Sequence, residues 1–229
     1  IAYKPAKEFK ATEYTQTYRF RSSKLQTLLK EMNRNSNNHA AIQIFEHVGG
    51  ADAFNPFVQK RLGLTDDDIL FLEGSGNNVG SNGKSAYNEA SCAAVVAVLK
   101  DYRKVLRAQD KDFKDVMAVV GGDITSTAQM YSNGKTQKAV VAKTGTVSPN
   151  VTLGGYVSTI KGNYFFFYSM RTNGTVADWS NARGQIGGLL TKFVASKNGG
   201  KPMAYKAVAF QSFDSASSLE LIGSSEGLK

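Results

Sequence analysis

The sequence predicts an α/β protein of the α+β kind, in which an antiparallel sheet is flanked by helices. Apolar residues recur with helical spacing in the first half of the chain. β-Branched and aromatic segments joined by a turn follow, and a last long helical pattern comes after them. The 229-residue chain has one cysteine and no apolar run of membrane-spanning length, so a disulfide scaffold and a membrane span are excluded.

Helices dominate the first part of the chain. Two amphipathic helices are expected on either side of a polar junction at residues 33–39, and Gly49-Gly50 is expected to end the second one. A third helix is expected from about Ser85 to Arg107, after a loop over 73–80 that is too rich in glycine for a regular element. The apolar positions of the first two helices are Leu25, Leu28, Leu29 and Met32, then Ala41, Ile44, Phe45 and Val48.

Strands are expected over residues 139–143, 155–160 and 164–171, with a hairpin turn at 161–163 between the last two. A final helix is expected over 176–196. Its buried face would hold Trp179, Ala182, Ile186, Leu189, Leu190 and Phe193. Residues 1–229 are interpreted as a portion of one domain, with 197–229 as a C-terminal extension of unknown role.

The net charge of +9 makes nucleic acid the first partner to consider. The basic residues are spread along the chain, however, and aspartates interleave with them in the densest stretch, residues 100–114. We therefore expect no nucleic-acid partner. Two histidines and one cysteine leave too few ligands for a zinc site, so no metal and no cofactor are expected.

The strongest chemical signal is Lys143-Thr144-Gly145-Thr146, at the end of an apolar strand. Upstream, Ser36-Asn37-Asn38 opens an amphipathic helix. Penicillin-binding proteins and class A β-lactamases carry K-T-G and a serine-asparagine motif of this kind. Both the order of the two motifs and their helix-then-strand placement match.

With the loop Glu73-Gly74-Ser75-Gly76 added, residues 24–194 resemble the type-4 penicillin-binding proteins, which are D-Ala-D-Ala carboxypeptidases and endopeptidases of bacterial cell-wall turnover. In that family the loop usually has Asp where Glu73 stands. The resemblance implies a penicillin-binding/β-lactamase-like transpeptidase fold, peptidoglycan stem peptides as substrates and β-lactams as inhibitors. It also implies a periplasmic or secreted location.

One motif of that family is missing. Its nucleophilic serine belongs to an S-x-x-K motif well before S-x-N, and the 35 residues that precede Ser36 contain none. The fold is therefore expected to be incomplete at its N-terminal side, with an upstream segment that carries S-x-x-K as its partner. Ser81, Ser132 and Ser158 begin S-x-x-K spellings, but all follow Ser36, and Ser132 and Ser158 are expected in turns. Ser81 directly precedes a helix and is the best alternative, although Gly83 and the order of the motifs argue against it.

The resemblance implies a role for each remaining motif residue. Ser36 would relay a proton to the leaving nitrogen, Asn38 would donate to the carbonyl of the stem peptide, and Lys143 would supply positive charge. Thr144 would bind the terminal carboxylate, and the N–H of Thr146 would form half of the oxyanion hole. The catalytic candidates are Ser36, Asn38 and Lys143, and the substrate-binding candidates are Thr144, Gly145 and Thr146.

Some alternatives remain open. Ser75-Gly76-Asn77 is a second S-x-N, although it lies in a glycine loop, and Ser36 could serve only as a helix N-cap. Cys92, among alanines, is expected to be buried. At the level of function, the alternatives are a non-catalytic peptidoglycan-binding relative and a β-lactamase-like hydrolase.

Overall fold

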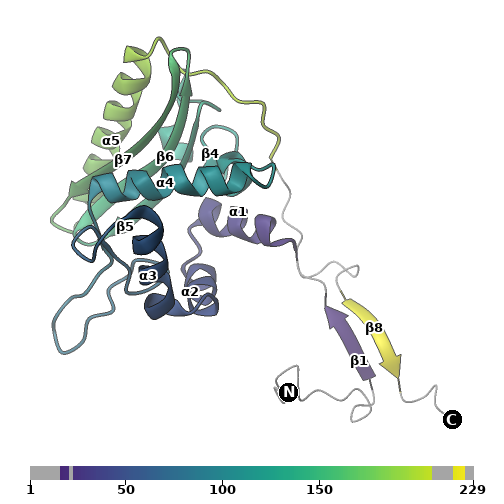
Figure 1. Cartoon of the computed structure of the whole chain (residues 1–229). Coiled ribbons are helices and arrows are strands. Elements are labelled where there is room, and N and C mark those ends of the chain that lie inside the picture. Colours follow the sequence, from purple (N-terminus) through teal and green to yellow (C-terminus); the bar gives the residue numbers. More distant parts are fainter. Residues whose placement is uncertain (1–15, 21–22, 208–218, 225–229) are drawn as a thin grey trace. The chain divides into compact units, whose positions relative to one another are not determined.

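The computed structural model describes residues 16–20, 23–207 and 219–224 (Figure 1). The chain divides into two compact units, one formed by residues 26–208 and the other by 1–25 together with 209–229. In the second unit, strand β1 (Gln16–Phe20) pairs antiparallel with strand β8 (Leu219–Ser224). All the remaining elements belong to the first unit, apart from the first residue of α1.

A four-stranded antiparallel sheet forms the centre of the first unit, in the order β4-β5-β6-β7. Its strands are β4 (Ala118–Val119), β5 (Val140–Val147), β6 (Asn150–Thr159) and β7 (Gly162–Arg171). The three expected strands are confirmed and are longer than expected. The hairpin turn lies at residues 160–161, not at 161–163 as expected, because Thr159 already pairs with Gly162.

The long helix before the sheet is α4 (Cys92–Arg107), which begins seven residues after the expected start at Ser85. Ser91 caps it, since its hydroxyl oxygen accepts a hydrogen bond from the backbone N–H of Ala94 at 3.1 Å. Just before that cap, the short strand β3 (Glu89–Ala90) pairs with β2 (Ile69–Leu70), and this pairing holds the chain extended. The helix therefore cannot begin earlier.

Helices α1 (Leu25–Asn35) and α2 (Asn38–His47) confirm the two expected amphipathic helices. The expectation that the glycine pair ends α2 is only partly confirmed. Gly49 has a positive φ of 101° and separates the helices, but Gly50 opens an unexpected helix, α3 (Gly50–Leu62). Phe54, Val58 and Leu62 repeat every four residues along α3 and pack into a small cluster against Ile69 and α4.

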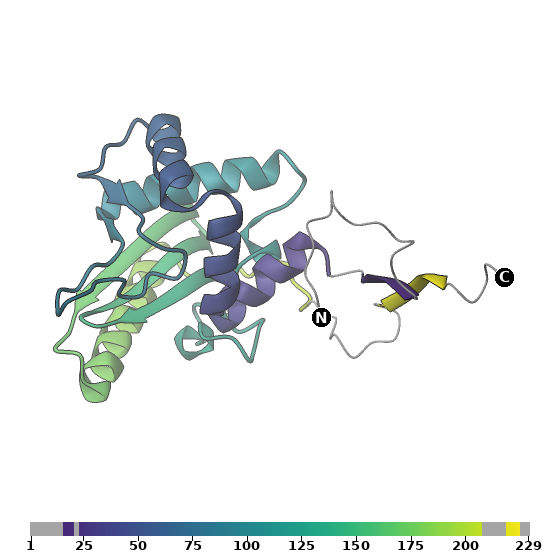
Figure 2. The same ribbon diagram turned by 90° about the horizontal axis from the view of Figure 1, so that it is seen from below.

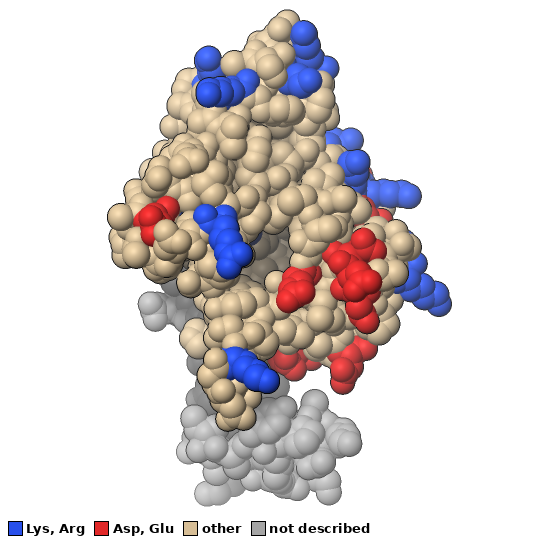
Figure 3. Space-filling view, turned by 90° about the vertical axis from the view of Figure 1, so that its left-hand side faces the viewer, with Lys and Arg blue, Asp and Glu red and all other residues tan. Residues whose placement is uncertain are grey.

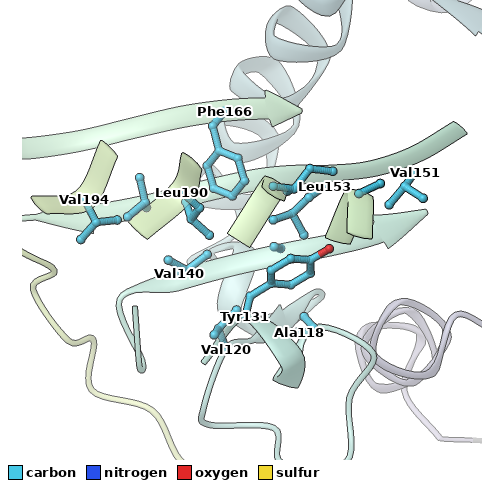
Figure 4. Close-up of a cluster of buried hydrophobic side chains, with 14 residues drawn as sticks. Ala118, Val120, Tyr131, Val140, Val151, Leu153, Phe166, Leu190 and Val194 are labelled. Carbon is cyan, nitrogen blue, oxygen red and sulfur yellow. The ribbon is translucent and has the colours of Figure 1, made fainter. Parts of the chain in front are cut away.

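The sheet lies between α4 and α5 (Val176–Ser196), which cover its opposite faces (Figures 1 and 2). The bounds of α5 match the expected helix. Figure 4 shows Leu190 and Val194 of α5 in the same buried cluster as Val140 and Phe166 of the sheet. Leu189, expected on this face, is 47% exposed instead.

Residues 197–207 return along the other edge of the core. The N–H of Lys201 donates to the Ser158 carbonyl at 2.9 Å, and the N–H of Met203 donates to the Lys138 carbonyl at 2.8 Å. Met203 and Tyr205 pack against the cluster beneath α4, which consists of Leu106, Phe113, Val116, Met117, Val119, Val141 and Tyr156. In the part of the chain that the structure describes, no helix is long and apolar enough to cross a membrane.

Candidate active site

Ser36 lies in the tight junction between α1 and α2. Its backbone adopts a left-handed conformation with φ 55°, and the N–H of Asn37 donates back to the Met32 carbonyl at 2.9 Å. Asn37, not Ser36, is the N-cap of α2, because its side-chain oxygen accepts from the N–H of Ala40 at 3.1 Å. The capping alternative for Ser36 is thus wrong, and its hydroxyl remains available to another group.

The second motif lies along a free edge of the sheet. Strand β4 pairs only with Val141 and Ala142, so residues 143–147 of β5 have a strand neighbour, β6, on one side alone. Gly145 lies opposite Thr152 of the neighbouring strand β6. A Cβ at this position would lie 2.3 Å from Thr152 Oγ1, well inside van der Waals contact.

Lys143 connects the two motifs. Its Nζ donates to Ser36 Oγ at 2.8 Å, and it also donates to the backbone carbonyl of Thr144. Burial lowers the pKa of Lys143 to about 8, from an ordinary value of 10.5. Because the ammonium and the free amine are both accessible near neutral pH, this side chain can give a proton to the serine oxygen or take one from it.

A cavity of about 810 Å³ opens over this contact. All six candidate residues line it, so the fold brings together motifs that are more than 100 positions apart in the sequence. The exposed side chain of Asn38, which forms no hydrogen bond within the described residues, lies at its rim. The lining candidates are Ser36, Asn38, Lys143, Thr144, Gly145 and Thr146.

The loop after α3 forms another wall of the cavity, to which Ser75, Gly76 and Asn77 contribute. The Glu73 carboxylate organises this loop by accepting from the N–H and hydroxyl of Ser75, at 2.9 and 2.6 Å, and from the N–H of Asn77 at 2.5 Å. Burial by itself would raise the pKa of Glu73, but these hydrogen bonds lower it below its ordinary value. The carboxylate therefore serves the loop, and the Ser75 hydroxyl is engaged by it.

Two lining residues were not found from the sequence. Thr144 Oγ1 donates to Thr127 Oγ1 at 2.7 Å, and the N–H of Thr127 donates to the Arg34 carbonyl at the end of α1, at 3.0 Å. Arg183 of α5 donates to Thr146 Oγ1 at 3.0 Å. Neither residue belongs to a motif, and only the folded arrangement of β5, α5 and the loop before β5 brings them to the cavity.

A buried ion pair fixes α1 to the core beside this site. Lys30 Nζ donates to Asp123 Oδ2 at 2.8 Å and to the backbone carbonyls of Lys114, at 3.0 Å, and Met117. The Tyr205 hydroxyl donates to the second oxygen of Asp123 at 2.6 Å. Burial lowers the pKa of Lys30, and Asp123 opposes that shift. The pair orients the helix that ends one residue before Ser36.

The sequence model of the D-Ala-D-Ala carboxypeptidase 3 (S13) family matches residues 10–193. The chain belongs to this family. The match covers both motifs, the loop at Glu73 and all five helices except the last three residues of α5. The resemblance to penicillin-binding peptidases and the penicillin-binding/β-lactamase-like fold are thereby confirmed.

Several solved structures are similar to this chain. The predatory endopeptidase Bd3459 of Bdellovibrio bacteriovorus, in complex with immunity protein Bd3460, is 36% identical with a TM-score of 0.86. The predatory endopeptidase Bd0816 of the same organism is 33% identical with a TM-score of 0.85. Each match covers 94% of this chain and 54% of the relative, so the chain spans about half the length of these relatives.

Penicillin binding protein 4 of Haemophilus influenzae is 20% identical with a TM-score of 0.57, over 72% of this chain and 38% of that protein. At this identity the likeness is one of fold. No curated protein matches the chain.

Three further serines begin S-x-x-K spellings, as the sequence showed. Ser81 and Ser132 lie in turns or loops and Ser158 in β6, so no S-x-x-K spelling of the described residues is helical. Cys92 was expected to be buried, but it is exposed at the first turn of α4 and lines the cavity. No group of histidine, cysteine and carboxylate side chains in the described ranges is arranged to hold a metal ion.

Charge on the face shown in Figure 3 is scattered. Lysine and arginine side chains lie in separate small patches, most of the acidic side chains gather at one side, and the surface is hollowed near its middle. This face therefore offers no continuous basic stripe of the kind that tracks a phosphate backbone.

Proposed function

We propose that this chain is the part of a serine-type D-Ala-D-Ala peptidase that carries the proton relay and the substrate-binding strand, and that it acts on peptidoglycan stem peptides. The observation that carries the proposal is the 2.8 Å hydrogen bond between Lys143 and Ser36 at the bottom of the cavity. The nucleophilic serine would belong to an upstream S-x-x-K segment, which would complete the enzyme outside the cytoplasm, where peptidoglycan lies.

The chemistry follows from acyl transfer. The upstream serine gives its hydroxyl proton to the lysine of its own S-x-x-K motif and attacks the carbonyl of the penultimate D-Ala, whose oxygen becomes an oxyanion held by the N–H groups of Thr146 and of the nucleophile. Collapse of this intermediate breaks the C–N bond. The leaving nitrogen takes its proton from Ser36 Oγ, which Lys143 Nζ replenishes. Water then attacks the acyl ester: its oxygen adds to the carbonyl carbon, its proton returns to Lys143, and the upstream lysine gives its proton back to the serine oxygen as the acyl group leaves.

Substrate would lie along the free edge of β5. The Thr144 hydroxyl would bind the terminal carboxylate, and the Asn38 amide would hold the preceding carbonyl of the stem. The relatives support this proposal: solved structures of Bd3459 describe it as a predatory peptidoglycan endopeptidase, and one of them is acylated by penicillin G. Both carboxypeptidase and endopeptidase products fit the same chemistry, because only the size of the leaving amine differs.

The test is the intact mass of the denatured protein before and after exposure to fluorescent penicillin. This chain alone and a longer chain that includes the upstream segment would be measured side by side. We expect no label on the 24.8 kDa chain alone and one label, in the upstream segment, on the longer protein. A stable adduct on a serine of the 229-residue chain would overturn the assignment of the nucleophile.

Two variants of the longer protein sharpen this test. Ser36→Ala removes the proton relay and should lower acylation by about a hundredfold or more. Ser132→Ala, which alters a half-buried S-x-x-K spelling outside the cavity, is the matched control and should leave acylation unchanged. Rapid turnover of a chromogenic β-lactam would favour the β-lactamase alternative, and complete lack of acylation would favour a binding protein.

A further inference from the structure

Acidic residues are almost absent from the second half of the first unit. Residues 24–123 contain 12 Lys and Arg residues and 13 Asp and Glu residues. Residues 124–207 contain 10 Lys and Arg residues but a single acidic residue, Asp178. Basic residues are therefore spread along the whole chain, but only those of the second half lack acidic neighbours in the sequence.

Five lysines of this second half meet at one end of the sheet, where the β6–β7 hairpin turns and α5 ends (Figure 1). The N–H of Lys161, in the hairpin, donates to the Lys197 carbonyl at the end of α5, at 3.3 Å. The segment after α5 then passes between β6 and Lys138, and Gly200 packs closely against the Lys135 carbonyl. We call these five residues the basic patch: Lys135, Lys138, Lys161, Lys197 and Lys201.

The charge of the basic patch is not neutralised within the part of the chain that the structure describes. None of its lysines forms an ion pair there. Asp178 lies near the opposite end of α5 from Lys197, roughly 28 Å away by helical rise. The same end of the sheet is uppermost in Figure 3, where the visible face carries Lys and Arg side chains and no acidic ones.

An apolar side chain stands at the tip of this basic end. Ile160, in the hairpin turn next to Lys161, is 62% exposed. A site for a soluble anion gains nothing from such a side chain. At the surface of an anionic bilayer, in contrast, an apolar group enters the boundary between headgroups and acyl chains while lysines contact the phosphates around it.

We propose that the basic patch and Ile160 form a docking surface for an anionic phospholipid bilayer. This inference is independent of the proposed function. The surface lies at the far end of β6 from the cavity, because Thr152, which lines the cavity, comes eight residues before Ile160. The rise of a strand places these two residues about 25 Å apart. Docking at the basic patch would therefore leave the cavity accessible to substrate.

The test is co-sedimentation of the 229-residue chain with vesicles of phosphatidylcholine alone and with vesicles that also contain one third phosphatidylglycerol. The chain should bind only the anionic vesicles, and added salt should weaken binding because it screens the headgroup charge. Replacing the three exposed lysines together, in Lys135→Gln/Lys161→Gln/Lys201→Gln, should lower the partition coefficient by roughly 100-fold.

The matched control is Lys60→Gln/Lys100→Gln/Lys104→Gln, which removes the same charge from exposed positions of α3 and α4. It should bind anionic vesicles within about threefold of the wild type. Urea unfolding should give the same stability for all variants, because the replaced side chains are exposed. A wild-type chain that does not bind anionic vesicles, or equal losses in the two triple variants, overturns the proposal.

Ile160→Asn separates a bilayer from a soluble polyanion as the partner. It should weaken vesicle binding by about 10-fold, through the loss of apolar burial, and should leave binding of soluble polyphosphate unchanged. If Ile160→Asn binds vesicles as the wild type does, Ile160 does not enter the bilayer. The basic patch would then be a site for phosphate-bearing polymers in general, and the bilayer assignment would be wrong.

Discussion

At the scale of single residues, the site depends on Lys143, whose amine is largely buried. The hydroxyl of Ser36 is available to Lys143 because the side chain of Asn37, not that of Ser36, caps α2. The lowered pKa of Lys143 is a cost to the folded state, since the charged amine would be better solvated in the unfolded chain. The same lowered pKa allows the amine to exchange a proton near neutral pH.

The lowered pKa of Lys143 predicts that the stability of the fold depends on pH. With a pKa of about 8 in the folded state and 10.5 ordinarily, Lys143 holds fewer protons when folded, so its contribution to stability rises between those two pH values. Relative to Lys143→Met, the wild-type chain should therefore gain about 2 kcal/mol of unfolding free energy between pH 7 and pH 10. Urea unfolding of both proteins at each pH measures the difference. A difference that does not vary with pH would show that Lys143 titrates normally.

At the scale of elements, α1 positions Ser36. Its last two turns are joined to the core by Lys30, by Asn33, whose side chain donates to the Val116 carbonyl at 2.7 Å, and by the Arg34 carbonyl. These partners lie in the segment from Lys114 to Thr127, which also contains β4. The helix that ends just before Ser36 is thus fixed to the sheet from which Lys143 projects.

Removal of one member of the buried pair tests this attachment. Lys30→Met leaves the buried Asp123 carboxylate with the Val119 N–H and the Tyr205 hydroxyl as its remaining partners among the described residues, and should lower the unfolding free energy by about 3–5 kcal/mol. Adding Asp123→Asn removes the unpaired charge and should restore much of the loss. As a control, Arg61→Gln breaks an exposed pair with Asp101 and should change stability little. Equal effects of Lys30→Met and Arg61→Gln in urea unfolding would refute the role of the buried pair.

The helices and strands differ in how far they could be predicted from the sequence. Helices α1, α2 and α5 and the three long strands could be predicted, because apolar or β-branched residues recur along each with a regular period. In α5 and the strands, that face is buried in the core. Helix α3 could not, since Gly50 and Pro56 suggest a break and its helical conformation is stabilised by packing of Phe54 and Val58. The start of α4 was misplaced because the pairing of β3 with β2 depends on residues 20 positions away.

At the scale of the whole molecule, the two motifs were predictable but their surroundings were not. Ser36 and Lys143 carry recognisable local patterns, whereas Thr127 and Arg183 acquire meaning only where a loop and α5 meet the end of β5. The same holds for the C-terminal residues. Tyr205 showed no pattern in the sequence, yet it completes the hydrogen bonding of Asp123, 82 positions earlier.

This last contact predicts where the chain can be shortened. Residues 24–207 contain the three described core clusters and Tyr205, so this shortened chain should unfold cooperatively within about 1 kcal/mol of the full chain. A chain of residues 24–200 lacks Met203 and Tyr205, exposes the cluster beneath α4 and leaves one Asp123 oxygen without its donor. It should lose a further 2–4 kcal/mol, about one buried hydrogen bond and part of an apolar side chain. Thermal and urea unfolding of the three chains would measure this, and equal stability of the two shortened chains would mean that residues 201–207 are dispensable to the core.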